Sequence, residues 1–108
     1  MNLYTYGDAD RAVNVPSLRH AYNVVSQREK ISLPPLEEIT VGTSNDGNFT
    51  LAIVTYNGRD PIGHRRVLMV GQGAAKRNPN DAFNRETGTT LAAIRALRQL
   101  GGIYEARS

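Results

Sequence analysis

The side chains best suited to chemistry in this sequence follow a pair of glycines in its second half. Gly71 and Gly73 are separated by one residue, and Lys76 and Arg77 come shortly after them. Both cations bind phosphate, lysine as a point charge and arginine as a planar fork. A nucleotide-binding loop needs more glycines, a Lys-Ser or Lys-Thr ending and a helix immediately afterwards, and none of these follows. The run therefore predicts a turn at the exit of a sheet, with an exposed cationic pair.

Histidine is the other residue type here that could carry chemistry. His64 follows Gly63 at the start of an expected strand and is the one candidate for acid-base catalysis. His20 and His64 lack the further ligands that a metal site needs. The absence of cysteine excludes thiolate ligands, a cysteine nucleophile and disulfides. We therefore predict a non-enzymatic protein with no catalytic residue, no cofactor and no metal.

Length and composition predict one folded domain. The chain has 108 residues, of which 40% are hydrophobic and 21% charged, values typical of a soluble globular protein. Its net charge of +3 and isoelectric point of 9.6 permit an anionic partner without requiring one. No stretch resembles a secretion signal or a membrane span, so we expect a cytoplasmic protein that does not contact a membrane.

The first element expected to position these residues is a helix that begins at Pro16 and Ser17, with the Ser17 side chain as its N-cap. Apolar residues recur behind it at helical spacing, at Leu18, Ala21, Tyr22 and Val25. The opposite, polar face carries Arg19, His20, Asn23, Gln27 and Arg28. Pro34 and Pro35 cannot continue this helix.

Three antiparallel strands are expected next. Ile39 and Val41 begin an alternating pattern that stops at 42–44, and the turn-forming residues 45–47 lead into the clearest strand, 49–56. A third strand is expected at 64–71.

A last helix should begin near Asn84 or Arg85 and end at the two glycines 101–102. Its buried stripe is expected at Leu91, Ile94 and Leu97. The fold class is therefore α+β in the order α-β-β-β-α, with both helices on one face of a three-stranded antiparallel sheet. We assign residues 1–16 to an arm, 17–102 to the domain and 103–108 to a tail.

This order of elements is that of the double-stranded RNA-binding domain. That family closes its third strand with G-x-G-x-S-K-K and continues into a helix containing A-A-x-x-A-L. The corresponding segments here are Gly71-Gln72-Gly73-Ala74-Ala75-Lys76-Arg77 and Ala92-Ala93-Ile94-Arg95-Ala96-Leu97. Residues 17–100 therefore resemble this family. The resemblance implies that duplex RNA or another nucleic acid is bound, with phosphates at Lys76, Arg77 and Arg85 and a groove beside His20, Asn23 and Gln27.

The loop between the basic pair and the last helix fits a second resemblance. Small actinobacterial and actinobacteriophage domains of unknown function carry a G-x-A-x-R-x-P-x-D-like segment and then G-x-x-L-A-x-x-R-A-L. Here residues 73–81 lead to residues 88–97 with a similar pattern, including Pro79 and Asp81. This resemblance brings no established activity with it.

Three functions follow as hypotheses. The first is a small binding or regulatory protein that contacts nucleic acid, as a monomer or a homodimer. The second is a phage-type effector that acts on a host protein without nucleic acid. The third is a ribonuclease, because small toxin ribonucleases of this general fold use a glycine-adjacent histidine, which His64 resembles.

Overall fold

The computed structural model describes residues 10–46, 48–76 and 85–107, without the side chains of 45, 46 and 85–87. The strands are β1 (Asp10–Arg11), β2 (Ile39–Asp46), β3 (Phe49–Arg59) and β4 (Arg66–Lys76). The helices are α1 (Pro16–Asn23) and α2 (Arg85–Glu105), and short turns of other helical types complete the order at η2 (Ala12–Asn14), η3 (Val24–Arg28) and η4 (Leu36–Glu38). The α+β class and the α-β-β-β-α order are therefore confirmed.

The sheet is antiparallel, and its strand order is β1-β2-β3-β4. It has one strand more than the three we expected, because Asp10 and Arg11 pair with Val41 and Thr40. Ala12, directly after this short strand, is fully buried. The chain thus joins the packed domain at residue 10, before the boundary at residue 17 that the sequence suggests.

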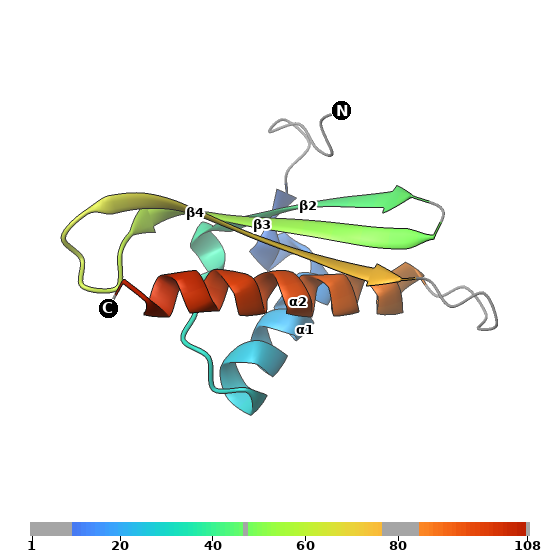
Figure 1. Cartoon of the computed structure of the whole chain (residues 1–108), viewed down its shortest axis with the longest axis horizontal. Helices are drawn as coiled ribbons and strands as arrows, with labels where there is room; N and C mark the ends of the chain where they lie inside the picture. Colours follow the sequence, from blue (N-terminus) through green and yellow to red (C-terminus); the bar gives the residue numbers. More distant parts are fainter. Residues whose placement is uncertain (1–9, 47, 77–84, 108) are drawn as a thin grey trace.

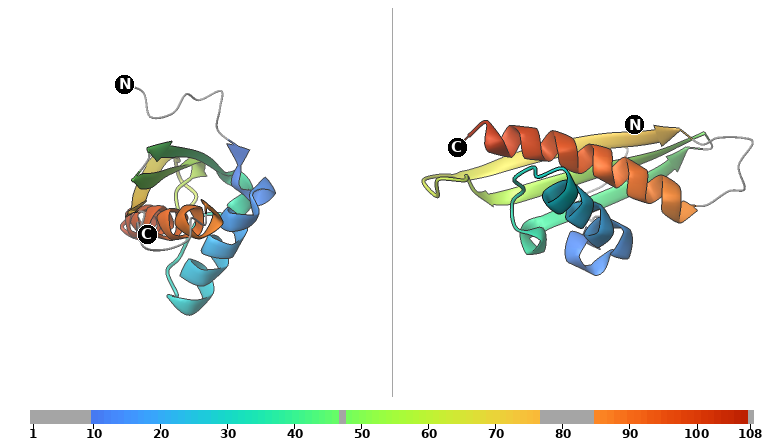
Figure 2. Two further views of the ribbon diagram at one scale, coloured as in Figure 1. Left: turned by 90° about the vertical axis from the view of Figure 1, so that its right-hand side faces the viewer. Right: turned by 90° about the horizontal axis from the view of Figure 1, so that it is seen from below.

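Both helices lie on the same side of the sheet (Figure 1). The long α2 runs beneath β3 and β4, and α1 packs against α2 on the side away from them (Figure 2). The other face of the sheet carries no helix among the described residues. The helix layer therefore separates an outer sheet face from the exposed side of α1.

The two glycines of the predicted sheet exit lie inside β4, so the prediction of a turn there is wrong. A Cβ built on Gly71 would lie 2.4 Å from the carbonyl oxygen of Ala96, and one on Gly73 would lie 2.4 Å from the carbonyl oxygen of Ala92. Such distances are too short for real Cβ atoms, so these positions need glycine for helix contact and not for a turn. The strand continues past them to Lys76.

The buried stripe of α2 also differs from the expected one. Leu97 is fully buried, but Leu91 is 38% exposed and Ile94 only half-buried. The residues that face the core are mostly alanines, which let α2 approach the two glycines of β4 closely: Ala92, Ala93, Ala96, Leu97 and Leu100. Two backbones can approach closely only where the side chains between them are small. The predicted stripe was based on the large apolar residues of α2 and therefore did not include these alanines.

Both helix boundaries move for identifiable reasons. Pro16 is the first helical residue and Val15 precedes it without a side-chain cap, so Ser17 is not the N-cap. At the other end, α2 continues through Gly101 to Glu105. A Cβ on Gly101 would lie 2.3 Å from Ile31 Cγ2, so this glycine accommodates the chain that returns from α1 and does not end the helix. Neither described α-helix is long and apolar enough to cross a membrane.

Candidate nucleic-acid interface

Strand register brings Lys76 to one end of the molecule. Lys76 pairs with Phe49, which pairs on its other side with Asp46, so β2 ends, β3 begins and β4 ends together. The first turns of α2 lie at the same end, since a Cβ on Gly88 would lie 3.1 Å from Thr50 Oγ1. Figure 1 shows this convergence. Four chain segments thus meet around exposed Lys76.

Two of the predicted phosphate contacts are only partly described. Arg77 lies outside the described residues. Arg85 is the first residue of α2, and its side chain is not described. Its position nevertheless matters, because the N-terminus of a helix as long as α2 carries a partial positive charge.

The exposed side of α1 is the one predicted from its periodicity. His20 and Asn23 of α1 and Gln27 of η3, which continues from it, are exposed, while Leu18 and Ala21 are fully buried. Arg19 is exposed on the same helix. The structure does not bring these side chains together with Lys76, because α2 lies between α1 and β4 (Figure 2). The predicted residues therefore form two separate contact regions.

Two arginines of α2 differ in how their charge is compensated. Arg98 donates two hydrogen bonds to the carboxylate of Glu29, at 2.7 and 2.6 Å. These bonds lower the pKa of Glu29 and, with a smaller opposing effect of burial, raise the pKa of Arg98. Arg95 instead donates to the carbonyl oxygen of Ala74 at 2.6 Å, a neutral acceptor, and among the described side chains no carboxylate pairs with it.

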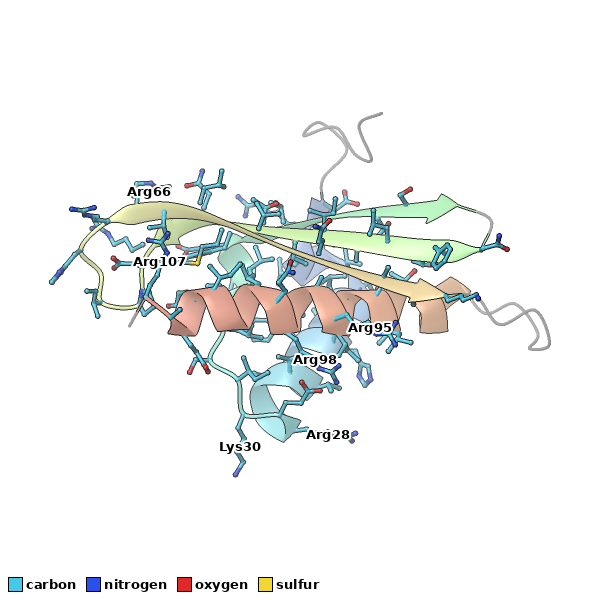
Figure 3. All side chains as sticks on the ribbon, viewed as in Figure 1. Arg28, Lys30, Arg66, Arg95, Arg98 and Arg107 are labelled. Carbon is cyan, nitrogen blue, oxygen red and sulfur yellow. The ribbon has the colours of Figure 1, made fainter. Side chains whose placement is uncertain are left out.

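Arg95 also lies near the predicted basic end, because Ala74 is two residues before Lys76 in β4. Figure 3 shows Arg95 and Arg98 along one side of α2, with Arg28 and Lys30 on the segment that follows α1. The partner of Arg98 is Glu29, which is distant in sequence, and for this reason helical spacing along α2 could not identify it.

Carboxylates are unevenly distributed over the described side chains. Glu37 and Glu38 precede β2, Asp60 follows β3, and Glu105 ends α2, all toward the β3–β4 hairpin. Glu29 is engaged by Arg98. The end where β4 ends and α2 begins also has two acidic residues, Asp46 and Glu86, whose side chains lie outside the described ones.

A second arginine group lies at the hairpin end, where sequence reasoning placed no site. Arg59 and Arg66 are direct cross-strand partners, and both are exposed. Arg65 directly precedes β4 and is not part of this cross-strand pair. The sequence predicted that the strand starting at residue 49 would end at residue 56, but β3 continues to Arg59 through Asn57 and Gly58, which usually break strands. A longer strand would have placed Arg59 opposite Arg66.

His64 also lies in this hairpin, two residues before β4. Its side chain is exposed, and its backbone N–H donates to Asp60 Oδ1 at 2.9 Å. Within residues 10–46, 48–76 and 85–107, no three His, Cys, Asp or Glu side chains are grouped to hold a metal ion. A role of His64 in catalysis stays a prediction.

No protein family, no curated protein and no solved structure matches this chain. What it binds must therefore be inferred from its own residues.

Proposed function

We propose that this chain is a non-enzymatic protein that binds nucleic acid, with duplex RNA as the preferred form. Lys76, Arg77 and Arg85 would contact phosphates, and the polar side of α1, with His20, Asn23 and Gln27, would lie beside a groove. One observation carries the proposal: strand register and the packing of Gly88 beside Thr50 bring Lys76 at the end of β4 and Arg85 at the start of α2 to the same end of the molecule.

Electrostatics supports this assignment. Each lysine or arginine that neutralises a phosphate releases counterions, and this release drives association with nucleic acid. The positive end of the α2 dipole adds to the charge of Lys76, and Arg95, bonded to the neutral Ala74 carbonyl, adds a further positive charge close by. The net charge of +3 is too small to attract polyanions over the whole surface, so a local concentration of charge is required.

The separation of the two contact regions is compatible with a duplex and not with a single phosphate. Domains that recognise A-form RNA contact successive minor grooves and the phosphates between them. Here the polar side of α1 and the end around Lys76 lie on either side of α2 (Figure 2). The resemblance of residues 17–100 to such domains favours duplex RNA over duplex DNA.

The salt dependence of affinity tests the proposal. We would measure binding of a 20-base-pair RNA, and of DNA of the same sequence, by wild type and by a Lys76→Ala/Arg77→Ala variant. For two lost phosphate contacts, the slope of log affinity against log salt should fall in magnitude by about 1.8 for DNA and comparably for RNA.

A matched variant, Arg65→Ala/Arg107→Ala, removes the same charge at the hairpin end. Figure 3 shows Arg107 there, at the end of α2. This control should retain the wild-type slope. The proposed site around Lys76 would be refuted if wild type and both variants had equal slopes, or if both variants lost the same amount of slope. RNA that stays intact during the measurement would also dispose of the ribonuclease hypothesis.

A further inference from the structure

β4 is the last strand of the sheet, and only part of its free edge is covered. The Gln72 N–H donates to Gln99 Oε1 at 2.8 Å, and the Ala74 carbonyl accepts from Arg95 at 2.6 Å. In an antiparallel ladder the backbone groups of alternate residues face the same edge. Leu68 and Val70 therefore share this edge, and no described side chain bonds to their backbone groups.

The side chains beside the open edge are apolar and exposed. Leu68 is 59% exposed and Val70 42%. Both point to the outer face of the sheet, because they alternate with buried Met69 and Gly71, which face α2. An uncovered edge flanked by exposed apolar side chains is a template for pairing with a further strand.

Two arginines adjoin this edge on the same outer face. Arg66 precedes Leu68 by two positions, and Arg59 pairs directly with Arg66 across the ladder. Like charges directly opposite each other destabilise a sheet, so this pair has a cost that a bound anion would offset. Two bonds hold the Arg59 end of the hairpin: Tyr56 Oη donates to the Arg59 carbonyl at 2.6 Å, and Arg59 Nη1 donates to the Gly63 carbonyl at 3.1 Å.

Carboxylates near the hairpin are directed elsewhere. Asp60 accepts from the His64 amide at 2.9 Å, and Glu105 accepts from the Ser32 amide at 2.7 Å. Of the strand residues that face outward and whose side chains are described, none is acidic. On the outer face of the described strands, the Arg59–Arg66 pair therefore has no acidic side chain opposite it, and an acidic side chain of a partner would complement it.

We propose that the edge formed by residues 66–70 binds an extended acidic peptide segment of another protein by strand addition. Main-chain hydrogen bonds to Leu68 and Val70 supply affinity, and alternate side chains supply specificity. The segment would place apolar side chains against Leu68 and Val70 and a glutamate or aspartate against the Arg59–Arg66 pair.

A second copy of this chain fits the edge less well. If Leu68 paired with Val70 of a second copy, Arg66 would face that copy's Gln72, whose amide is held by Gln99. The Arg59–Arg66 pairs of the two copies would then lie at opposite ends of the joined edge, and neither pair would meet a carboxylate of the other copy's β4. Charge complementarity therefore favours an acidic peptide.

Amide hydrogen exchange tests strand addition directly. The probe is an acetylated peptide containing Val-Thr-Val-Thr-Glu, whose alternate residues can face Val70, Leu68 and Arg66 in antiparallel pairing. Met69 pairs with Tyr56 and Val67 with Gly58, so the amides of Met69 and Val67 should be protected with or without peptide. The amides of Leu68 and Val70 should exchange fast in the free protein and slow at least about tenfold at saturation.

Variants separate this edge from the proposed nucleic-acid site. Arg66→Glu should weaken peptide binding at least about tenfold. Lys76→Glu, the same charge change at the other end of β4, should leave peptide binding unchanged. Val70→Pro removes one free-edge donor without removing a bond to β3, and it should also abolish binding. Should that variant not fold, Arg66→Glu with Lys76→Glu still decides the matter.

Two results would overturn the inference. One is unchanged exchange of the Leu68 and Val70 amides with the peptide at about 1 mM. The other is a doubled mass of the free protein with both amides already protected, which would assign the edge to a second copy. Neither result depends on whether the protein binds nucleic acid.

Discussion

Gly73 lies so close to α2 that a Cβ added to it would be 2.4 Å from the amide nitrogen of Ala96. This contact between β4 and α2 brings Arg95 to the Ala74 carbonyl and Gln99 to the Gln72 amide. The covered and open parts of the β4 edge both follow from it. The glycine pair thus determines where a partner could join the sheet.

Gly73→Ala should destabilise the fold by about 1–3 kcal/mol, since its methyl group would meet helix backbone that cannot move aside alone. Gly102→Ala is the matched change, because a Cβ there has nothing within 4 Å. Replacement of glycine in a helix should stabilise by about 0.5–1 kcal/mol. Urea unfolding monitored by circular dichroism measures the stability of both variants. A similar change in the free energy of unfolding for Gly73→Ala and Gly102→Ala would contradict the close contact between Gly73 and α2.

Leu97→Ala should cost about 2–5 kcal/mol, because a fully buried leucine leaves a cavity in the core. Leu91→Ala removes the same atoms from a side chain that is 38% exposed, so its cost should be well below that of Leu97→Ala. Thermal unfolding of the two variants compares them directly. A larger loss of stability for Leu91→Ala than for Leu97→Ala would instead support the buried stripe predicted from the sequence.

The Glu29–Arg98 pair should make a small, pH-dependent contribution to stability. The side chains are 25% and 50% exposed, so Glu29→Gln should reduce the free energy of unfolding at pH 7 by less than about 1 kcal/mol. Folding lowers the Glu29 pKa from its usual 4.5. Its contribution is therefore complete above pH 4.5 and is lost as the pH falls through the lower, folded value.

Chemical denaturation of wild type and Glu29→Gln from pH 7 to pH 2 checks this. The two unfolding free energies should differ at neutral pH and converge in acid. In a double-mutant cycle with Arg98→Gln, the coupling should disappear over the same range. A difference that grows as the pH falls would be inconsistent with a lowered pKa of Glu29.

The element order was predictable because local signals agreed with it. The i, i+3, i+4 pattern placed α1, and alternation from Phe49 placed β3. Misassignments arose where tertiary contact changed the role of a residue. Gly73 is a residue type common in turns, but here it lets α2 pack closely against β4. Gly101 is a residue type common at helix ends, but here it leaves room for the Ile31 side chain.

The candidate site was predictable only in part for the same reason. Periodicity identified the exposed side of α1 and η3, including Asn23 and Gln27. It could not show that α2 separates that side from Lys76, or that Arg98 pairs with Glu29, because both depend on contacts between distant segments. The Arg59–Arg66 pair depends on hairpin register, which the breaker residues between the strands concealed.

Chemical-shift mapping of the ¹⁵N-labelled protein during titration with a 20-base-pair RNA at low salt tests the proposed function most directly. The account predicts shifts at His20, Asn23, Gln27, Lys76 and the start of α2, with the Arg59–Arg66 hairpin unchanged. Absence of shifts with both RNA and DNA of the same sequence, or shifts confined to the hairpin, would contradict it.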